Sequence, residues 1–274
     1  MIGSLKPLFA AFPACFILLA PQLALAQQPL TEERCPRMVA EAPPRVIPAS
    51  FRLAALNQGE VQLTYIGHST FLIESAAGVR IATDYNDYVR PQAVPDIVTM
   101  NRAHSTHYTN KPDPAIKHVL RGWGREGEPA RYDLQHEDVW VRNVVTNIRD
   151  YGGGTALHGN SIFVFETGGV CIAHLGHLHH TLTPAHIDEM GRIDVVLVPV
   201  DGTFTLNVEG MVEVLKQINA PLAIPMHIFS ESTLERFLAA MGAIYDIERG
   251  TARSVVVSHA TLPAKPKLLV LPGR

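Results

Sequence analysis

The stretch from Asp96 to His107 constrains the fold more than any other part of the sequence. Its first half, Asp96 to Met100, is a short apolar run with Val and Ile, which is typical of a buried strand. Its second half is polar and carries His104 and His107, three residues apart. Because a strand fixes its backbone, the loop after it can aim imidazole nitrogens at one point. This stretch predicts a sheet with a metal-binding or catalytic edge.

The spacing of apolar residues divides the chain into two halves. Short alternating runs in the first half predict a meander of strands, and strand–helix alternation in the second half predicts an α/β fold. No repeat or linker requires a second domain. The predicted strands cover residues 61–66, 70–74, 79–83, 96–100, 137–148, 161–166, 170–174, 194–199, 222–226, 255–257 and 268–270, and the predicted helices begin after Thr183 and cover 208–218 and 232–243.

Residues 1–26 have the pattern of a secretory signal peptide. Lys6 precedes an apolar core, and a small-x-small site ends at Ala26. A membrane anchor is the weaker alternative, because prolines interrupt a run that is short for a span. We therefore expect a periplasmic or secreted protein with no membrane span in the mature chain. A Pro-rich arm over residues 27–59 would precede one domain over 60–274.

The composition narrows the function further. Cleavage after Ala26 leaves 248 of the 274 residues, enough for one large core. The net charge of −3 becomes −4, because the removed part carries Lys6 and no acid. That charge argues against nucleic-acid binding, whereas thirteen histidines favour metal chemistry. The sequence leaves open whether Cys35 and Cys171 form a disulfide or remain separate buried thiols.

Polar residues follow four of the predicted strands. A lone histidine is more often structural than ligating, but loops on one sheet edge can converge, so four such groups together predict a site. The groups are Arg102/His104/His107, Arg149/Asp150, His174/His177/His179/His180, and His227.

With these motifs the chain resembles the metallo-β-lactamase-fold hydrolases, near the ascorbate-lactone hydrolases and the N-acyl-phosphatidylethanolamine-type phospholipases. The resemblance covers roughly residues 60 to 260. It implies a four-layer αβ/βα sandwich with a metal site at one edge. The matching segments are Tyr65 to Glu74, Gly159-Asn160 with Ile162 to Glu166, Ile172 to Gly176, Asp194 to Val200, and Ile224 to His227.

The ligand motifs depart from the family pattern at the first metal. The family's His-x-His-x-Asp-His reads Arg102-Ala-His-Ser-Thr-His107 here, and Arg149 aligns with the family's next histidine. A guanidinium is permanently cationic and cannot ligate a metal. We therefore expect no ion at this position. Arg102 and Arg149 are instead expected to bind an anionic group of a small-molecule substrate.

The second metal keeps more of its ligands. The family's bridging Asp is replaced by His177, and His107 and His227 match its histidines, while Thr106 replaces the Asp that orients water. Three imidazoles suffice for one tetrahedral Zn²⁺ with an open position. His104 is expected to join the coordination or to act as a base.

Further residues receive weaker assignments. Asp84 and Asp201 are candidate catalytic carboxylates, although exposed carboxylates after strands are common. His68 is expected to line the site or to brace it. His174 is expected to lie in the core or behind the ligands, and His179 and His180 to face solvent or lie near the mouth of the site. His158 is an alternative ligand. The remaining histidines are expected to be ordinary surface residues: His118, His136, His186 and His259.

These assignments predict an exported hydrolase that uses a metal-bound hydroxide on an ester, lactone, amide or phosphodiester bond. The resemblance does not favour β-lactams, since this branch generally serves other substrates. The alternative is a non-catalytic member of the fold that binds an anionic small molecule.

Overall fold

A computed structural model describes residues 56–150 and 152–273. The predicted signal peptide and most of the predicted N-terminal arm lie outside the described residues. Within them, no helix is both long and apolar enough to cross a membrane.

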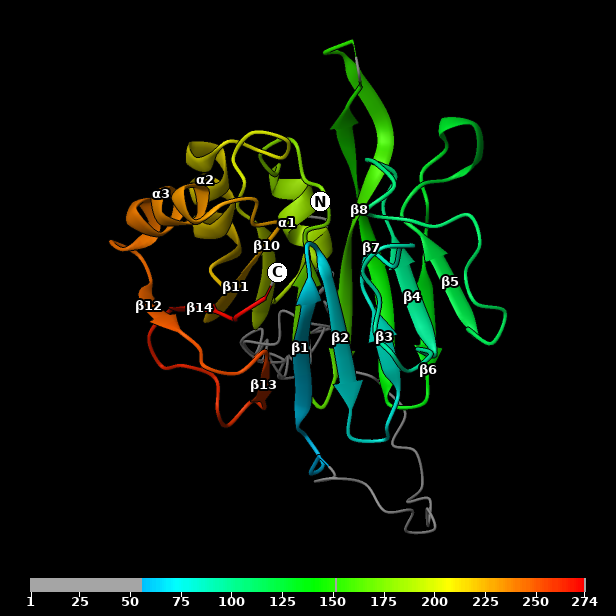
Figure 1. Ribbon diagram of the computed structural model, residues 1–274, viewed down its shortest axis with the longest axis horizontal. Coiled ribbons are helices and arrows are strands. Elements are labelled where there is room, and N and C mark those ends of the chain that lie inside the picture. Colours follow the sequence, from blue (N-terminus) through cyan, green and yellow to red (C-terminus); the bar gives the residue numbers. More distant parts are fainter. Residues whose placement is uncertain (1–55, 151, 274) are drawn as a thin grey trace, which may run out of the picture. The chain divides into compact units, whose positions relative to one another are not determined.

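The described residues form two sheets (Figure 1). In both, antiparallel hairpins lie beside parallel strands. The first sheet has the order β13 (Ser254–Val257), β1 (Val61–Gly67), β2 (Thr70–Ser75), β3 (Arg80–Ala82), β4 (Ile97–Met100) and β5 (His118–Arg121). The second has the order β12 (Asp246–Arg249), β14 (Lys267–Val270), β11 (Leu222–Met226), β10 (Val195–Pro199), β9 (Val170–His174), β8 (Thr155–Thr167), β7 (Val139–Arg149) and β6 (Asp133–His136).

Three α-helices follow the later strands, each with a polar cap at its start. Thr183 caps α1 (Pro184–Met190), with Pro184 at the first turn as the sequence predicts. Asn207 caps α2 (Val208–Ile218), and Ser230 caps α3 (Glu231–Met241). A short 3₁₀ helix, η1, covers Arg125–Gly127.

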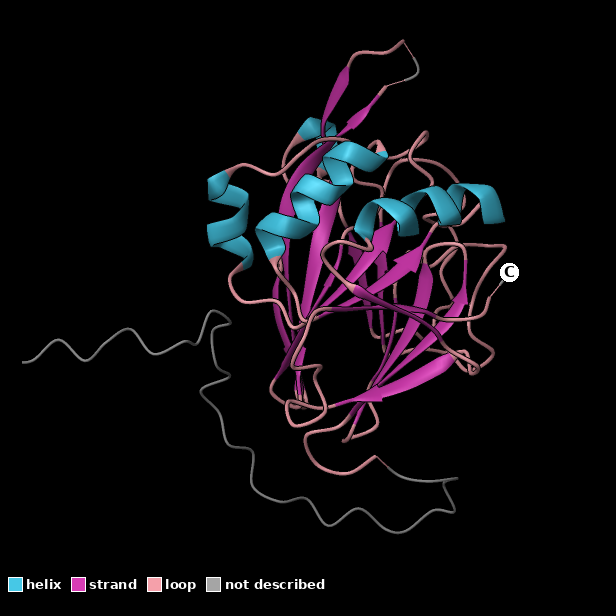
Figure 2. Cartoon of the chain, turned by 90° about the vertical axis from the view of Figure 1, so that its left-hand side faces the viewer, coloured by secondary structure: helices cyan, strands magenta, loops and turns pink. Residues whose placement is uncertain are grey.

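The second sheet lies between the helices and the first sheet (Figures 1 and 2). Successive side chains of a strand point to opposite faces. Val164 of β8 therefore packs with the helices, whereas its neighbours Phe163 and Phe165 pack against the first sheet. The outer face of the first sheet carries a smaller cluster that includes Tyr85 and Met100. The predicted α/β sandwich is confirmed, with loops rather than described α-helices over this outer face.

Several local features differ from the sequence prediction. Strands β5, β6 and β12 were not predicted, because they lack a buried apolar run: most positions of β5 and β6 are only partly buried or exposed, and β12 is exposed throughout. Strand β8 begins at Thr155, so residues 152–154 form part of the tip of a long hairpin that projects from the sheets (Figure 1). Cys171 is buried in β9 and disulfide-bonded, with its partner outside the described residues.

Candidate metal centre

Four histidines meet where parallel strands of both sheets end. His104 and His107 lie after β4, His177 lies after β9, and His227 directly follows β11. One nitrogen from each ring lies within 4.8 Å of the others. His104 is partly exposed, whereas the other three imidazoles are buried. The structure thus brings together all four histidines that the sequence suggested as ligands.

The spacing of the rings suits one small cation. The Nε2 atoms of His104 and His177 are 3.1 Å apart, and those of His107 and His227 are 3.3 Å apart. A tetrahedral zinc ion with Zn–N bonds of about 2.0–2.1 Å places its ligand nitrogens roughly 3.3–3.4 Å from each other. The donor set and spacing therefore fit zinc.

Each ring also has a partner on its other nitrogen. In metalloproteins such a partner fixes the orientation and tautomer of a ligating imidazole. The Nδ1 contacts are His104 to Thr106 Oγ1 at 2.7 Å, His107 to Asp84 Oδ2 at 2.6 Å, His177 to His179 Nε2 at 2.5 Å, and His227 to Asp201 Oδ1 at 2.9 Å.

Asp84 lies behind His107, not beside the open side of the cluster. It is fully buried, has a left-handed backbone with φ of 42°, and accepts a hydrogen bond from Asn101 Nδ2 at 3.0 Å. Burial raises its pKa, and the charge of His174 and the bond from Asn101 offset part of that effect. In this geometry both oxygens of Asp84 are engaged with other side chains, Asn101 and His107.

Asp201 has the corresponding position behind His227. Its Oδ2 accepts backbone hydrogen bonds from Thr203, Phe204 and Thr205, so the carboxylate also fixes the loop after β10. Burial would raise its pKa, but hydrogen bonds from His227 and Thr205 outweigh burial and lower it overall. This carboxylate therefore positions the imidazole of His227.

Burial favours the neutral form of three of the clustered imidazoles. It is the main cause that lowers the pKa of His104, His107 and His177, and neighbouring imidazoles add to the effect. A neutral ring has one nitrogen lone pair available for a metal, whereas a protonated ring has none. With the two aspartates behind them, the rings form a site whose charge suits a divalent cation.

Arg149 does not have the predicted role of an anion-binding side chain. Its Nη2 donates to the carbonyls of residues 203, 204 and 205, and its Nε donates to His179 Nδ1 at 3.0 Å. His179 Nε2 in turn contacts His177 Nδ1 at 2.5 Å, so Arg149 orients His177 through His179. Burial, followed by the charge of Arg149, lowers the pKa of His179 to about 4.

Arg102 follows β4, two residues before His104, and His68 lies beside the clustered rings. Arg102 is exposed, and its guanidinium has no hydrogen-bond partner among the described residues. His68 lies with its ring centroid 4.3 Å from that of His227, and burial, followed by His227, lowers its pKa to about 4. Thr106 Oγ1 lies between His68 Nε2, at 3.0 Å, and His104 Nδ1.

Two asparagines and a glycine that the sequence did not suggest as site residues support the cluster. Asn160 Oδ1 accepts a hydrogen bond from the backbone N–H of His177 at 2.8 Å, while Asn101 binds Asp84. A Cβ at Gly176 would lie 2.4 Å from both amide groups, so only glycine fits there. Gly176 and Asn160 lie within the motifs that carry the family resemblance, but nothing local showed that they touch.

The other histidines do not join the cluster. His174 is buried and contacts the Ser69 carbonyl at 2.8 Å, consistent with the position in the core or behind the ligands expected for it. His158 contacts the Gly127 carbonyl at 2.7 Å and does not serve as the alternative ligand. His118 and His136 contact each other at 3.2 Å.

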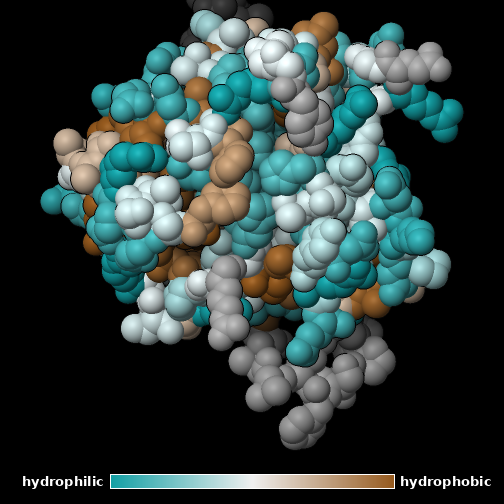
Figure 3. Space-filling model, turned by 45° about the horizontal axis from the view of Figure 1, so that its top comes forward, coloured by the Kyte–Doolittle hydropathy of each residue, from teal (hydrophilic) through white to brown (hydrophobic). Residues whose placement is uncertain are grey.

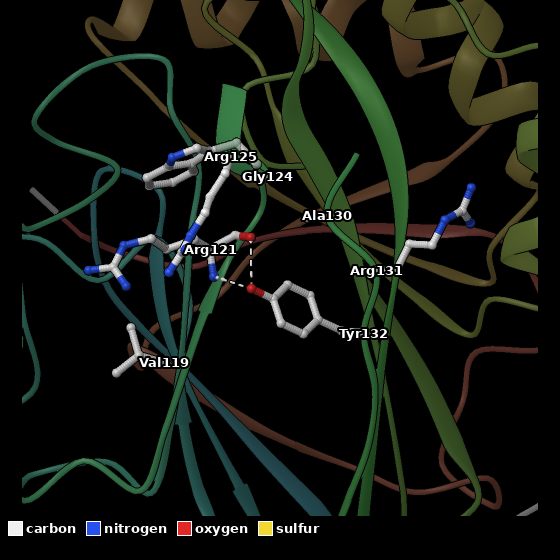
Figure 4. A pocket seen from close by; sticks show the side chains of 8 residues that line it. Val119, Arg121, Gly124, Arg125, Ala130, Arg131 and Tyr132 are labelled. Atoms are coloured by element: carbon white, nitrogen blue, oxygen red, sulfur yellow. Dashed lines mark hydrogen bonds between the residues drawn. The ribbon is translucent and has the colours of Figure 1, made fainter. Parts of the chain in front are cut away.

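A separate hollow of about 310 Å³ lies beside β5 (Figure 4). Its lining includes Arg121, Arg125, Arg131 and Trp123, and none of the four clustered histidines. The hydroxyl of Tyr132 accepts from the backbone N–H of Arg121 and donates to its carbonyl, which ties the segment before β6 to β5.

Comparison with known proteins identifies the family. A family model described as "Beta-lactamase superfamily domain" matches residues 62–227, more than half of the chain and all four clustered histidines. The chain belongs to this superfamily. A "UPF0173 metal-dependent hydrolase" from Methanoculleus marisnigri is 28% identical over 181 residues, covering 61% of this chain and 80% of the relative. One from Thermoplasma acidophilum is 26% identical, covering 67% and 92%.

Solved structures agree with this membership. A Thermotoga maritima protein assigned to the Zn-dependent hydrolases of the metallo-beta-lactamase superfamily superposes with a TM-score of 0.58 and 28% identity, covering 78% of this chain and 100% of that one. A metallo hydrolase from Ignicoccus hospitalis shares the fold, with a TM-score of 0.51 and 18% identity. The resemblance drawn from the sequence motifs is confirmed.

Proposed function

We propose that this superfamily member is a hydrolase that holds one Zn²⁺ among His104, His107, His177 and His227 and cleaves an ester, lactone, amide or phosphodiester bond. One observation carries the proposal: four imidazoles direct Nε2 to a common point while a partner fixes each Nδ1. Bound zinc would lower the pKa of water and polarise the bond to be cleaved. The relatives named metal-dependent hydrolases support this interpretation.

Within the cluster we assign two roles. The three buried rings, His107, His177 and His227, hold the ion. His104 is more exposed, and its Nδ1 contacts the neutral hydroxyl of Thr106, so it would be the ring that accepts a proton from the attacking water. This division provides the open position that a catalytic zinc needs and that four permanent ligands would close.

The substrate is proposed to carry an anionic group. Arg102 is the candidate to bind that group, because its exposed guanidinium is not committed to a described residue. The proposal retains the periplasmic or secreted location expected from residues 1–26.

Zinc content of the purified full chain tests the proposal. We expect about one zinc per chain, nearly none in His107→Ala or His227→Ala, and a retained ion with lost hydrolysis in His104→Ala. His136→Ala, outside the cluster, is the matched control. Circular dichroism would establish that each variant is folded.

Substrate assays complete the test. p-Nitrophenyl acetate and bis(p-nitrophenyl) phosphate represent the ester and phosphodiester classes. Zinc retained by both folded His107→Ala and His227→Ala would refute the ligand assignment. A wild-type chain that takes up no zinc but binds phosphate would instead support the non-catalytic anion-binding alternative.

A further inference from the structure

Two exposed phenylalanines lie directly beside the histidine cluster. Phe204 is 60% exposed and Phe229 is 54% exposed, and their ring centroids are 5.2 Å apart. Phe229 also lies 4.9 Å from the ring of His227, nearly perpendicular to it, and 5.8 Å from the ring of His68. The pair forms an apolar surface continuous with the metal centre, which we call the phenylalanine shelf.

The backbone beneath the shelf is held in place although its side chains are open. The N–H of Phe204 donates to Asp201 at 2.5 Å, and its carbonyl accepts from Arg149 at 2.9 Å. Phe229 lies between His227 and Ser230, the residue that caps α3. These contacts fix the backbone of Phe204 and set Phe229 directly before the cap of α3, so ordered backbone carries both residues of the shelf.

Leaving both rings half exposed forgoes stabilisation. A fully buried phenylalanine side chain contributes more to stability than one left half exposed, so each ring here obtains only part of that gain. Paired apolar groups exposed next to a reactive centre are typical of a ligand-binding surface. Figure 3, which brings this edge of the sheets forward, shows apolar side chains exposed among hydrophilic ones.

We infer that the phenylalanine shelf binds an apolar acyl or aryl group of the substrate, adjoining the bond that is cleaved. The inference rests on the proposed function. The contact of Phe229 with His227 places such a group next to the ligand cluster, and Arg102 is separately available for a charged group. The substrate class is therefore amphipathic: an apolar group attached to a hydrolysable carbonyl or phosphoryl centre.

Octanoate and acetate test the shelf without requiring turnover. Both carry a carboxylate that zinc can bind, but only octanoate has a chain to cover the rings. In calorimetric titrations of the zinc-loaded full chain, wild type should bind octanoate roughly tenfold more tightly than acetate, which corresponds to burying only a couple of methylene groups. Phe204→Ala and Phe229→Ala should reduce that ratio severalfold and leave acetate affinity within about twofold.

The control and the other outcomes make the test decisive. Val256→Ala, which removes an exposed apolar side chain from β13, should keep the wild-type ratio. Equal affinities in wild type, or a ratio that survives both phenylalanine variants, would overturn the inference. Variants that keep the ratio and only convert a dimer to a monomer in sedimentation would overturn it too. If the ratio behaves as expected but p-nitrophenyl octanoate and acetate are not hydrolysed, the shelf stands and the ester form of the proposed function fails.

Discussion

Gly176 offers the sharpest test of how the metal centre is held, because it touches no metal. Its backbone has φ of 60°, and a Cβ there would lie 2.4 Å from Asn101 Nδ2 and from Asn160 Oδ1. One of these amides holds Asp84 and the other holds the backbone of His177. Gly176→Ala should therefore disturb two ligands at once.

The expected cost follows from two terms. A left-handed alanine costs about 1–2 kcal/mol. Displacing the amides adds up to about 1.5–3 kcal/mol for the bond to the carboxylate and about 0.5–1.5 kcal/mol for the bond from His177. We expect Gly176→Ala to lower the free energy of unfolding by roughly 3–6 kcal/mol, and zinc affinity by about 10–100-fold, as when an outer-shell partner of a ligand is lost.

Gly169 is the matched control. It has φ of 74° in the turn between β8 and β9, and no atom lies within 4 Å of the position that an alanine Cβ would take there. Gly169→Ala should lower the free energy of unfolding only by the cost of a left-handed alanine, about 1–2 kcal/mol, and should leave zinc affinity unchanged. Denaturant unfolding and a chelator competition measure both quantities. Equal losses in the two variants would refute the reasoning, since the buried amides would then accommodate a methyl group freely.

Three further outcomes are expected. Asp84→Asn should lower zinc affinity about 10–100-fold, because an amide donor replaces one acceptor, whereas Asp138→Asn should leave it unchanged in the same competition assay. Without metal, unfolding free energy should fall between pH 6.5 and about 4: His68 has a pKa of about 4 when folded, so the unfolded state takes up its proton first. A flat profile in denaturant titrations would contradict this. Thr106→Val should retain zinc yet slow hydrolysis, measured as kcat.

The sequence could predict the cluster from two signals together. The loops after β9 and β11 leave the same edge of the second sheet, so polar residues in them can converge. The family motifs, which also matched the loop after β4, then selected His107, His177 and His227 as ligands. Short polar strands such as β6 have no comparable signal, because their pairing depends on a neighbour that is already in place.

The roles of the charged residues could not be predicted in the same way. Asp84, Asp201 and Arg149 all lie near strand ends, and the sequence suggested that they face the substrate. Their direction depends instead on backbone torsions and on loops distant in sequence: Asp84 turns back through a left-handed φ, and Arg149 finds carbonyls more than fifty residues away. The alternation of apolar and polar residues along a strand indicates neither these backbone torsions nor these long-range contacts.

The same contacts explain why the four ligands need not be equivalent. His107 and His227 are each fixed by a buried carboxylate that has further hydrogen-bond donors, and His177 is fixed through His179 by an arginine that also holds the loop after β10. His104 has only a neutral hydroxyl behind it and is partly exposed. A carboxylate partner strengthens an imidazole as a ligand more than a hydroxyl does. The ring that faces solvent is thus also the least firmly held, and it is the one that can leave the metal without dismantling the site.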